Sequence, residues 1–259
     1  MYFCVVITVN IVGSGNVAWH LATQLVRSTQ VELQQWASRN NDVSALFSAL
    51  QSYHTSLEKL RPAQLTILAV SDTAIAGVST ALPYTDQLVV HTSGSTAMEV
   101  LDNKNKKGVF YPLQTFTKGI ALDFTVIPIC LEAQDEISYT TLKTVASALS
   151  EKIHTITTTQ RKQLHLAAVF ANNFTNHCYT VAQEICEKHE LPFELLHELI
   201  KETTHKALHT TPNQSQTGPA KRGDTTTLEK QKETLDSAAY QELYTALSKA
   251  ITTYYGKKL

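Results

Sequence analysis

The stretch N-I-V-G-S-G-N-V-A-W-H-L-A, residues 10–22, decides the fold. It places Gly13, Gly15 and Ala18 in the pattern G-x-G-x-x-[GA] directly after an apolar run. In a dinucleotide-binding turn the first glycine allows the tight bend and the second lets a pyrophosphate approach the backbone. The third small residue allows the helix to pack closely on the strand. A plain strand-to-helix turn fits the same spacing, so the surrounding sequence has to separate the two interpretations.

The first part of the chain alternates short β-rich runs with helical patterns, which is typical of a parallel sheet with crossover helices. Strands are expected at 4–12, 33–38, 65–70, 87–92, 108–112, 124–132 and 152–157, with helices at 17–27, 42–51, 73–82 and 135–150. Because the glycine motif ends the first strand and opens the first helix, this context favours a nucleotide site.

The pattern changes after residue 159. Residues 160–188 contain no glycine or proline, and their apolar residues recur at helical spacing, which predicts one long helix. Two more helices are expected at 192–206 and 236–255, with a polar loop at 211–227 that has no strand or helix pattern. The sequence thus predicts an α/β Rossmann-type parallel-sheet domain, residues 1–157, followed by an all-α C-terminal domain, residues 158–259.

The end of the second strand indicates which dinucleotide binds. NAD-binding domains place an acidic residue there for the ribose 2′-hydroxyl, whereas this chain reads Ser38-Arg39-Asn40. Arg39 can pair with a 2′-phosphate and its neighbours can add hydrogen bonds, although it could also be a solvated surface arginine. The sequence therefore predicts NADP (NADPH) as the cofactor. The expected cofactor-binding residues are Gly13, Ser14, Gly15, Asn16, Val17, Ser38, Arg39, Asn40, Val70, Ser71, Asp72, His91, Thr92, Ser93 and Gly94.

Two further strand ends belong to this expected site. Ligands of open α/β sheets bind at the carboxyl ends of the strands. The segments V-S-D (70–72) and H-T-S-G-S (91–95) should therefore border the nicotinamide ribose. Alternatively, Asp72 caps the following helix and His91 is a strand histidine whose hydrogen bonds are satisfied internally.

Several motifs resemble those of a known group of proteins. They are the GxGxxA turn, V-S-D, H-T-S-G-S, F-Y-P-L-Q-T-F, H-L-A-A-V-F-A-N-N-F-T-N-H and G-P-A-K-R-G-D, and they span nearly the whole chain. The group pairs a Rossmann-like NADP-binding domain with a C-terminal domain of unknown function. Its wider relatives are ketopantoate reductase, pyrroline-5-carboxylate reductase and the β-hydroxyacid dehydrogenases, and their helical domains resemble that of 6-phosphogluconate dehydrogenase. The resemblance implies NADP(H) binding, oxidoreductase activity and a homodimer through the C-terminal helices.

The same resemblance points to catalytic residues on the long helix. Ketopantoate reductases carry a lysine and an asparagine there to protonate and orient a carbonyl. This chain has His165 at the lysine position, Val169 at the asparagine position, and Asn173 one turn further on. A histidine can donate a proton near neutral pH, so His165 and Asn173 are the expected catalytic residues. The chain thus departs from the relatives' catalytic pattern at the lysine and at the first asparagine.

The expected substrate is a small carbonyl or imine compound, acidic or neutral, bound between the two domains. Its expected contacts are Tyr111, Asn172, Arg222 and Asp224, each of which has a purely structural alternative in packing or in a solvated loop. Arg161, near the start of the long helix, is expected either to attract an anionic substrate or to be a surface cation. An NADP(H)-binding sensor or scaffold without turnover is the alternative function.

Charge and composition exclude other classes. The net charge is −1 and lysine and arginine do not cluster, so we expect no nucleic-acid partner. The apolar N-terminal run is too short to span a bilayer, so we expect a cytoplasmic protein without a membrane partner. His205 and His209 are spaced i, i+4 but lack the pattern of a zinc site, and no metal is expected.

Overall fold

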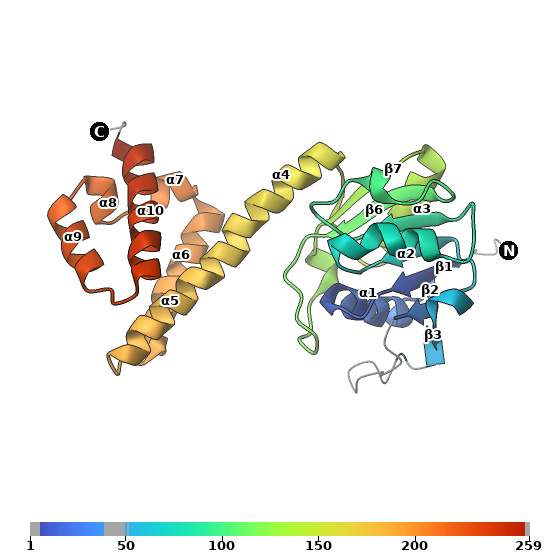
Figure 1. Ribbon diagram of the computed structural model, residues 1–259, viewed down its shortest axis with the longest axis horizontal. Coiled ribbons are helices and arrows are strands. Elements are labelled where there is room, and N and C mark those ends of the chain that lie inside the picture. The colour runs from blue at the N-terminus through green and yellow to red at the C-terminus, as the bar shows by residue number, and fades with distance from the viewer. Residues whose placement is uncertain (1–5, 39–49, 51, 257–259) are drawn as a thin grey trace. The chain divides into compact units, whose positions relative to one another are not determined.

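The computed structural model describes residues 6–38, 50 and 52–256. The chain divides into two compact units between Asn172 and Asn173, inside the long helix (Figure 1). The change in composition predicts a domain boundary at 157/158, where this helix begins. The first turns of this helix belong to the same unit as the sheet, and Arg161 within them is fully buried.

The first unit is built on an eight-stranded sheet with the order β3-β2-β1-β4-β5-β6-β7-β8. All neighbouring strands run parallel except β6 and β7, which are antiparallel. The strand order reverses between β1 and β4, which is where open α/β sheets bind ligands. The strands are β1 (Ile7–Val12), β2 (Val31–Ala37), β3 (His54–Thr55), β4 (Leu65–Leu68), β5 (Leu88–His91), β6 (Lys106–Pro112), β7 (Ile129–Ala133) and β8 (Ile153–Thr155).

Helices cover both faces of this sheet. On one face α1 (Asn16–Arg27) and α3 (Glu136–Ser147) pack through Leu21 and Val145 against strand residues such as Ile11. On the other face α2 (Ile75–Ala81) packs through Ile75 against residues such as Val89. A mostly parallel sheet covered on both faces confirms the predicted Rossmann-type α/β class.

The predicted strand over 124–132 is wrong in its first half. Residues Phe124–Val126 form a 3-10 turn, which is capped by the Asp123 carboxylate accepting the Thr125 amide at 3.0 Å. The strand β7 begins only at Ile129. The predicted helix over 42–51 lies outside the described residues, apart from residue 50.

The remaining helices confirm the all-α C-terminal region (Figure 1). The long helix consists of α4 (Thr158–Ala168), a π-helical turn over Val169–Phe174 and α5 (Thr175–Lys188). The sequence does not predict the π-helical turn. The other helices are α6 (His197–His209), α7 (Pro212–Ser215), α8 (Pro219–Arg222), α9 (Thr225–Glu233) and α10 (Ala238–Tyr255).

The expected loop at 211–227 is wrong, because it contains α7, α8 and the first residues of α9. Proline stands in the first turn of both α7 and α8, where its missing N–H is not needed. Gly223, with φ of +71°, ends α8 in the left-handed conformation, and Asp224 caps α9. Each helix is too short to show hydrophobic periodicity, so the composition suggested a loop.

Candidate functional site

The chain turns from β1 into α1 at Gly13, which has φ of +137°. A Cβ atom at this position would lie 2.1 Å from the carbonyl oxygen of Ala69. The Gly13 amide donates to the carbonyl of Ala37 at 2.8 Å, and its carbonyl accepts the Trp36 indole N–H at 2.6 Å. The turn is therefore fixed against β2 and the segment after β4, and only glycine fits there.

The N-terminus of α1 can receive an anion. Gly15 is the N-cap residue, no side chain caps the helix, and the first turn carries no acidic residue. A Cβ atom at Gly15 would meet nothing within 4 Å. The free backbone N–H groups and the positive end of the helix dipole are therefore available to a phosphate. This geometry fits the pyrophosphate of a dinucleotide.

A cavity of about 370 Å³, which we call the strand-end cavity, lies at this edge of the sheet. Its volume is within the usual range for small-molecule sites. The structure brings together here nine residues that the sequence predicts to bind the cofactor: Gly13, Ser14, Gly15, Asn16, Val17, Ser38, Val70, Ser71 and Thr92. Arg39 and Asn40, which the sequence predicts to select NADP, lie outside the described residues.

Asp72 and the serine turn after β5 form hydrogen bonds to each other and do not line the strand-end cavity. The Asp72 carboxylate accepts the Ser95 hydroxyl at 2.5 Å. Burial opposes ionisation of Asp72, but hydrogen bonds from Ser95, Ser93 and Thr96 outweigh it and keep the pKa below its usual value. Asp72 thus joins the segment after β4 to this turn, while Ser93 and Gly94 lie within the turn itself.

His91, at the end of β5, is fully buried and shapes the same turn. Its Nδ1 accepts the Ser93 amide at 3.2 Å, so its Nε2 carries the proton that faces the Ala97 carbonyl at 3.4 Å. Burial lowers the pKa of His91 to about 4, and the positive charge of Arg161 acts in the same direction. The ring is therefore neutral near pH 7, and its side chain makes these internal bonds instead of lining the strand-end cavity.

Arg161 of α4 is fully buried, and this corrects the expectation of an exposed or substrate-facing cation. One guanidinium nitrogen donates to the carbonyls of Ser93 and Thr96, at 3.0 and 2.7 Å. The other donates to the Glu132 carboxylate at 2.9 Å, and that carboxylate also accepts the Thr158 amide at 2.7 Å. Arg161 thereby holds the start of α4 on β7 and on the turn after β5.

His165 lies one helical turn after Arg161 and contacts the same turn of the chain. The Tyr111 hydroxyl, at the end of β6, lies 3.0 Å from Nδ1 of His165. A Cβ atom at Gly94 would lie 2.5 Å from this Nδ1 and 2.9 Å from the Tyr111 ring. Because residue 94 is a glycine, there is room for the side chains of Tyr111 and His165. Burial raises the pKa of Tyr111 to about 12, so it remains a phenol at neutral pH.

The other predicted site residues lie further along the helices. Asn172 and Asn173 are exposed in the π-helical turn. Arg222 ends α8, and Asp224 caps α9 by accepting the Thr227 amide at 3.1 Å and its hydroxyl at 2.7 Å. The hydrogen bonds from Thr227 keep the pKa of Asp224 below its usual value.

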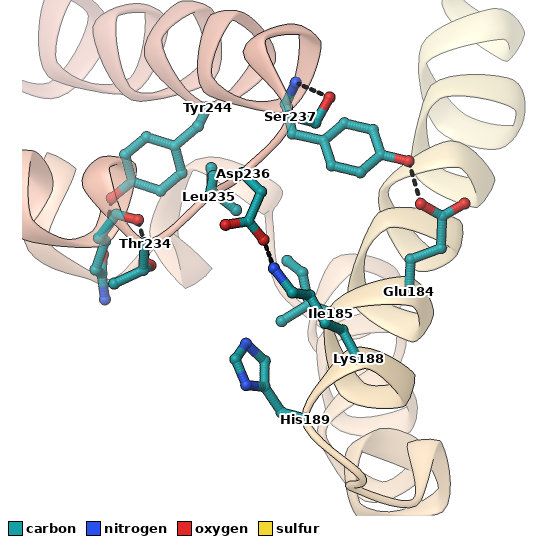
Figure 2. Close-up of a pocket in the computed structure, with 11 residues that line it drawn as sticks. Glu184, Ile185, Lys188, His189, Thr234, Leu235, Asp236, Ser237 and Tyr244 are labelled. Carbon is teal, nitrogen blue, oxygen red and sulfur yellow. Dashed lines mark hydrogen bonds and ion pairs between the residues drawn. The ribbon is translucent and has the colours of Figure 1, made fainter.

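The second unit has a cavity of its own, of about 410 Å³, between α5 and the segment that leads into α10 (Figure 2). The Lys188 ammonium pairs with the Asp236 carboxylate, and the Tyr240 hydroxyl donates to Glu184. No residue that the sequence predicts as functional lines this cavity. In the described part of the chain, no three His, Cys, Asp or Glu side chains gather to hold a metal, and no helix is long and apolar enough to cross a membrane.

Sequence reasoning missed Glu132 altogether and did not predict that Arg161 is buried and paired with it. Two signals were available: Glu132 follows the buried strand residues of β7, where a carboxylate needs a partner, and Arg161 precedes His165 by four residues, which places both on one helix face. Neither signal identifies the backbone carbonyls that Arg161 binds, because these lie 65–68 residues earlier in the chain.

The fold and the strand-end geometry define a Rossmann-type α/β protein with an all-helical C-terminal part. Residues 127–251 match a family described as "Domain of unknown function (DUF2520)". A solved structure from Bacteroides fragilis, described as a "putative NADP oxidoreductase", is 36% identical. It covers 96% of this chain and 98% of its own, with a TM-score of 0.88. The chain therefore belongs to the same family as this Bacteroides fragilis protein, with a DUF2520 match over residues 127–251, which confirms the resemblance predicted from the motifs.

More distant structures share the fold. A Thermotoga maritima protein is 23% identical, with a TM-score of 0.69 and coverage of 96% of this chain and 99% of its own. The Plasmodium falciparum pyrroline carboxylate reductase with NADP bound is 14% identical, with a TM-score of 0.61 and coverage of 95% and 98%. No curated protein matches the chain.

Proposed function

We propose that the protein is an NADP(H)-dependent oxidoreductase that acts on a small carbonyl or imine compound. The supporting observation is the convergence of two features at one sheet edge: the strand-end cavity with its open helix N-terminus, and the Tyr111–His165 pair on the turn after β5. Thr92 lines the cavity, and Gly94, two residues later, contacts His165. The relative from Bacteroides fragilis, described as a "putative NADP oxidoreductase", supports the same class.

In this proposal the amides around Gly13–Val17 bind the pyrophosphate, and the strand-end segments Val70–Ser71 and Thr92 border the nicotinamide ribose. When bound, a reduced nicotinamide would supply hydride to the carbon of a C=O or C=N group. His165 donates the proton to the oxygen or nitrogen of that group, and Asn173 orients it. Tyr111, Asn172, Arg222 and Asp224 remain proposed substrate contacts, and NADP selection rests on Arg39 with Ser38 and Asn40.

Cofactor choice can be tested with Arg39→Ala. The loss of a charge-assisted bond to the 2′-phosphate should weaken NADPH binding by about 1.5–3 kcal/mol and leave NADH binding nearly unchanged. Isothermal titration calorimetry measures both affinities, with Arg27→Ala, at the exposed end of α1, as the control. Equal losses for the two cofactors would contradict the proposal that Arg39 selects NADP.

Turnover is tested by following NADPH absorbance with a panel of small keto acids, aldehydes and imines. An oxidoreductase should consume NADPH with at least one class, and His165→Ala and Asn173→Ala should each slow it by about 100-fold or more. Tight NADPH binding without turnover on any substrate would point instead to a cofactor sensor or scaffold.

We also propose a homodimer formed through the C-terminal helices, with no nucleic-acid or membrane partner. Among the described residues of the second unit, only Cys186 and Ala220 are buried. Large apolar side chains such as Leu195, Leu199 and Tyr254 are 68%, 63% and 55% exposed. Helices without a core of their own are stabilised when a second copy covers such surfaces.

A further inference from the structure

Tyr111 and His165 form a hydrogen bond whose direction can be worked out from the donors and acceptors around it. The Tyr111 side chain is only 8% exposed, and a buried hydroxyl requires an acceptor for its proton. In the described part of the chain, the acceptor within reach is Nδ1 of His165, at 3.0 Å. The phenol therefore donates to Nδ1, and a neutral His165 ring must carry its proton on Nε2.

We propose that Tyr111 is a positioning residue that holds His165 in the Nε2–H tautomer, so that Nε2–H is the group presented to the substrate. The inference deepens the proposed function and rests on it for the role of His165. Among the described residues no hydrogen-bond partner occupies Nε2, and the side chain is half-buried.

The surrounding structure leaves the pair little freedom. A side chain at position 94 would overlap both rings, since a Cβ atom there would lie 2.5 Å from Nδ1 and 2.9 Å from the Tyr111 ring. Arg161, one helical turn before His165, bonds to the carbonyls on both sides of Gly94. Arg161 thus fixes α4, and with it His165, against the turn after β5. Tyr111 fixes the tautomer of His165.

The arrangement also defines where the donated proton comes from. When the Nε2 proton passes to the substrate oxygen or nitrogen, the Tyr111 proton passes to Nδ1. The imidazole ring then remains neutral and the phenolate carries the negative charge until water returns a proton. Transfer of the Tyr111 proton to Nδ1 avoids the imidazolate ion that loss of the Nε2 proton alone would leave.

Nitrogen-15 NMR of histidine-labelled protein tests the tautomer directly, without cofactor or substrate. At about pH 9, where histidine rings are ordinarily neutral, His165 should show the Nε2–H pattern. Its signals are assigned from their loss in His165→Gln. In Tyr111→Phe, which keeps the ring but removes the hydroxyl, the pattern should change to a mixture containing the Nδ1–H form.

The matched control is Tyr139→Phe, because the Tyr139 hydroxyl bonds to Thr155 and makes no contact with His165. It should leave the His165 pattern unchanged. An Nδ1–H pattern in the unmodified protein, or an unchanged Nε2–H pattern in Tyr111→Phe, would overturn the inference. These spectra do not depend on turnover, so failure of the oxidoreductase proposal would be seen separately in the NADPH assay.

With a substrate identified, Tyr111→Phe should lower kcat by about 10- to 100-fold and leave KM within about twofold. Solvent isotope measurements should show two transferred protons in the unmodified enzyme and one in the variant. A variant that changes only KM would assign Tyr111 to substrate binding and overturn the positioning role.

Discussion

Gly13 and Gly15 lie two positions apart in one turn, yet the structure places different constraints on them. At Gly13 a Cβ atom would collide with the Ala69 carbonyl at 2.1 Å, and φ is +137°. At Gly15 the space is open and φ is −78°. We therefore expect Gly13→Ala to lower the free energy of unfolding by about 2 kcal/mol or more. Urea denaturation monitored by circular dichroism measures this.

Gly15→Ala should leave the free energy of unfolding within about 0.5 kcal/mol of the unmodified protein. It should weaken NADPH binding, because its methyl group occupies the space through which a phosphate approaches. Gly77→Ala, in α2, also meets no atom within 4 Å and is the control for both measurements. If Gly15→Ala bound NADPH normally, the pyrophosphate would not lie at this helix end.

The histidine at the end of β5 makes stability depend on pH. Its pKa is about 4 in the folded protein, against 6.5 for an ordinary histidine. Between these values the unfolded chain binds a proton that the folded protein does not. The free energy of unfolding should therefore be at its full value above about pH 6.5 and fall by roughly 3 kcal/mol as the pH drops to about 4.

Urea denaturation from pH 8 to about pH 4 checks this effect. His91→Gln, which cannot titrate, should show a flatter curve in that window, and the exposed His154→Gln provides the control. A curve for His91→Gln that parallels the unmodified protein would show that another group causes the pH dependence.

The roles of some single residues can be predicted from the sequence alone. The roles of Gly13 and Gly15 can be read from their spacing, because the pattern expresses a local backbone requirement. For His91 and Tyr111 the sequence leaves a ligand contact and a structural role open, because the choice depends on partners brought together by the sheet. His91 ends β5 and Tyr111 lies one residue before the end of β6, but their hydrogen bonds appear only once β5, β6 and α4 are placed.

At the scale of elements, α4 is held on the sheet by a buried ion pair. Glu132→Gln removes the counter-charge of a fully buried guanidinium and should lower the free energy of unfolding by about 3–5 kcal/mol. Thermal and urea denaturation measure the loss, and the exposed Glu136→Gln in α3 is the control. A loss below about 1 kcal/mol would mean that the pair does not anchor α4.

Asp224, which the sequence predicts to contact the substrate, has a structural role at the start of α9. As the N-cap of α9, Asp224 should tolerate serine, which also caps helices, whereas alanine should cost about 1 kcal/mol. Differential scanning calorimetry compares Asp224→Ser with Asp224→Ala. If Asp224 also binds substrate, Asp224→Ser should raise KM while stability is unchanged.

The long elements could be predicted and the short ones could not. Six of the strands and the long helices follow from apolar runs and helical periodicity, which extend over enough residues to be read. The helices α7 and α8 have four residues each, so only their proline and glycine positions indicate them. The antiparallel pairing of β6 with β7 depends on where the chain returns after the Phe124–Val126 turn, which no local pattern records.

At the scale of the whole molecule, the second unit should be stable only when another copy covers its apolar surface. Leu195→Glu combined with Leu199→Glu should raise the dimer dissociation constant by about 100-fold or more, because burial of two leucines is lost. Sedimentation velocity over a concentration series measures this, and Lys230→Glu in α9 is the control. A monomer in the unmodified protein would contradict the homodimer.

The anchoring of α4 by Arg161 has a practical consequence for dividing the protein. A fragment cut at residue 157, where the composition changes, would leave the Glu132 carboxylate and the carbonyls of Ser93 and Thr96 without their cation. Its nucleotide-binding edge would then have to rearrange or take up water. A fragment that keeps this edge intact should therefore end beyond Ala168. It would then include α4, although the composition of α4 resembles that of the helical C-terminal part.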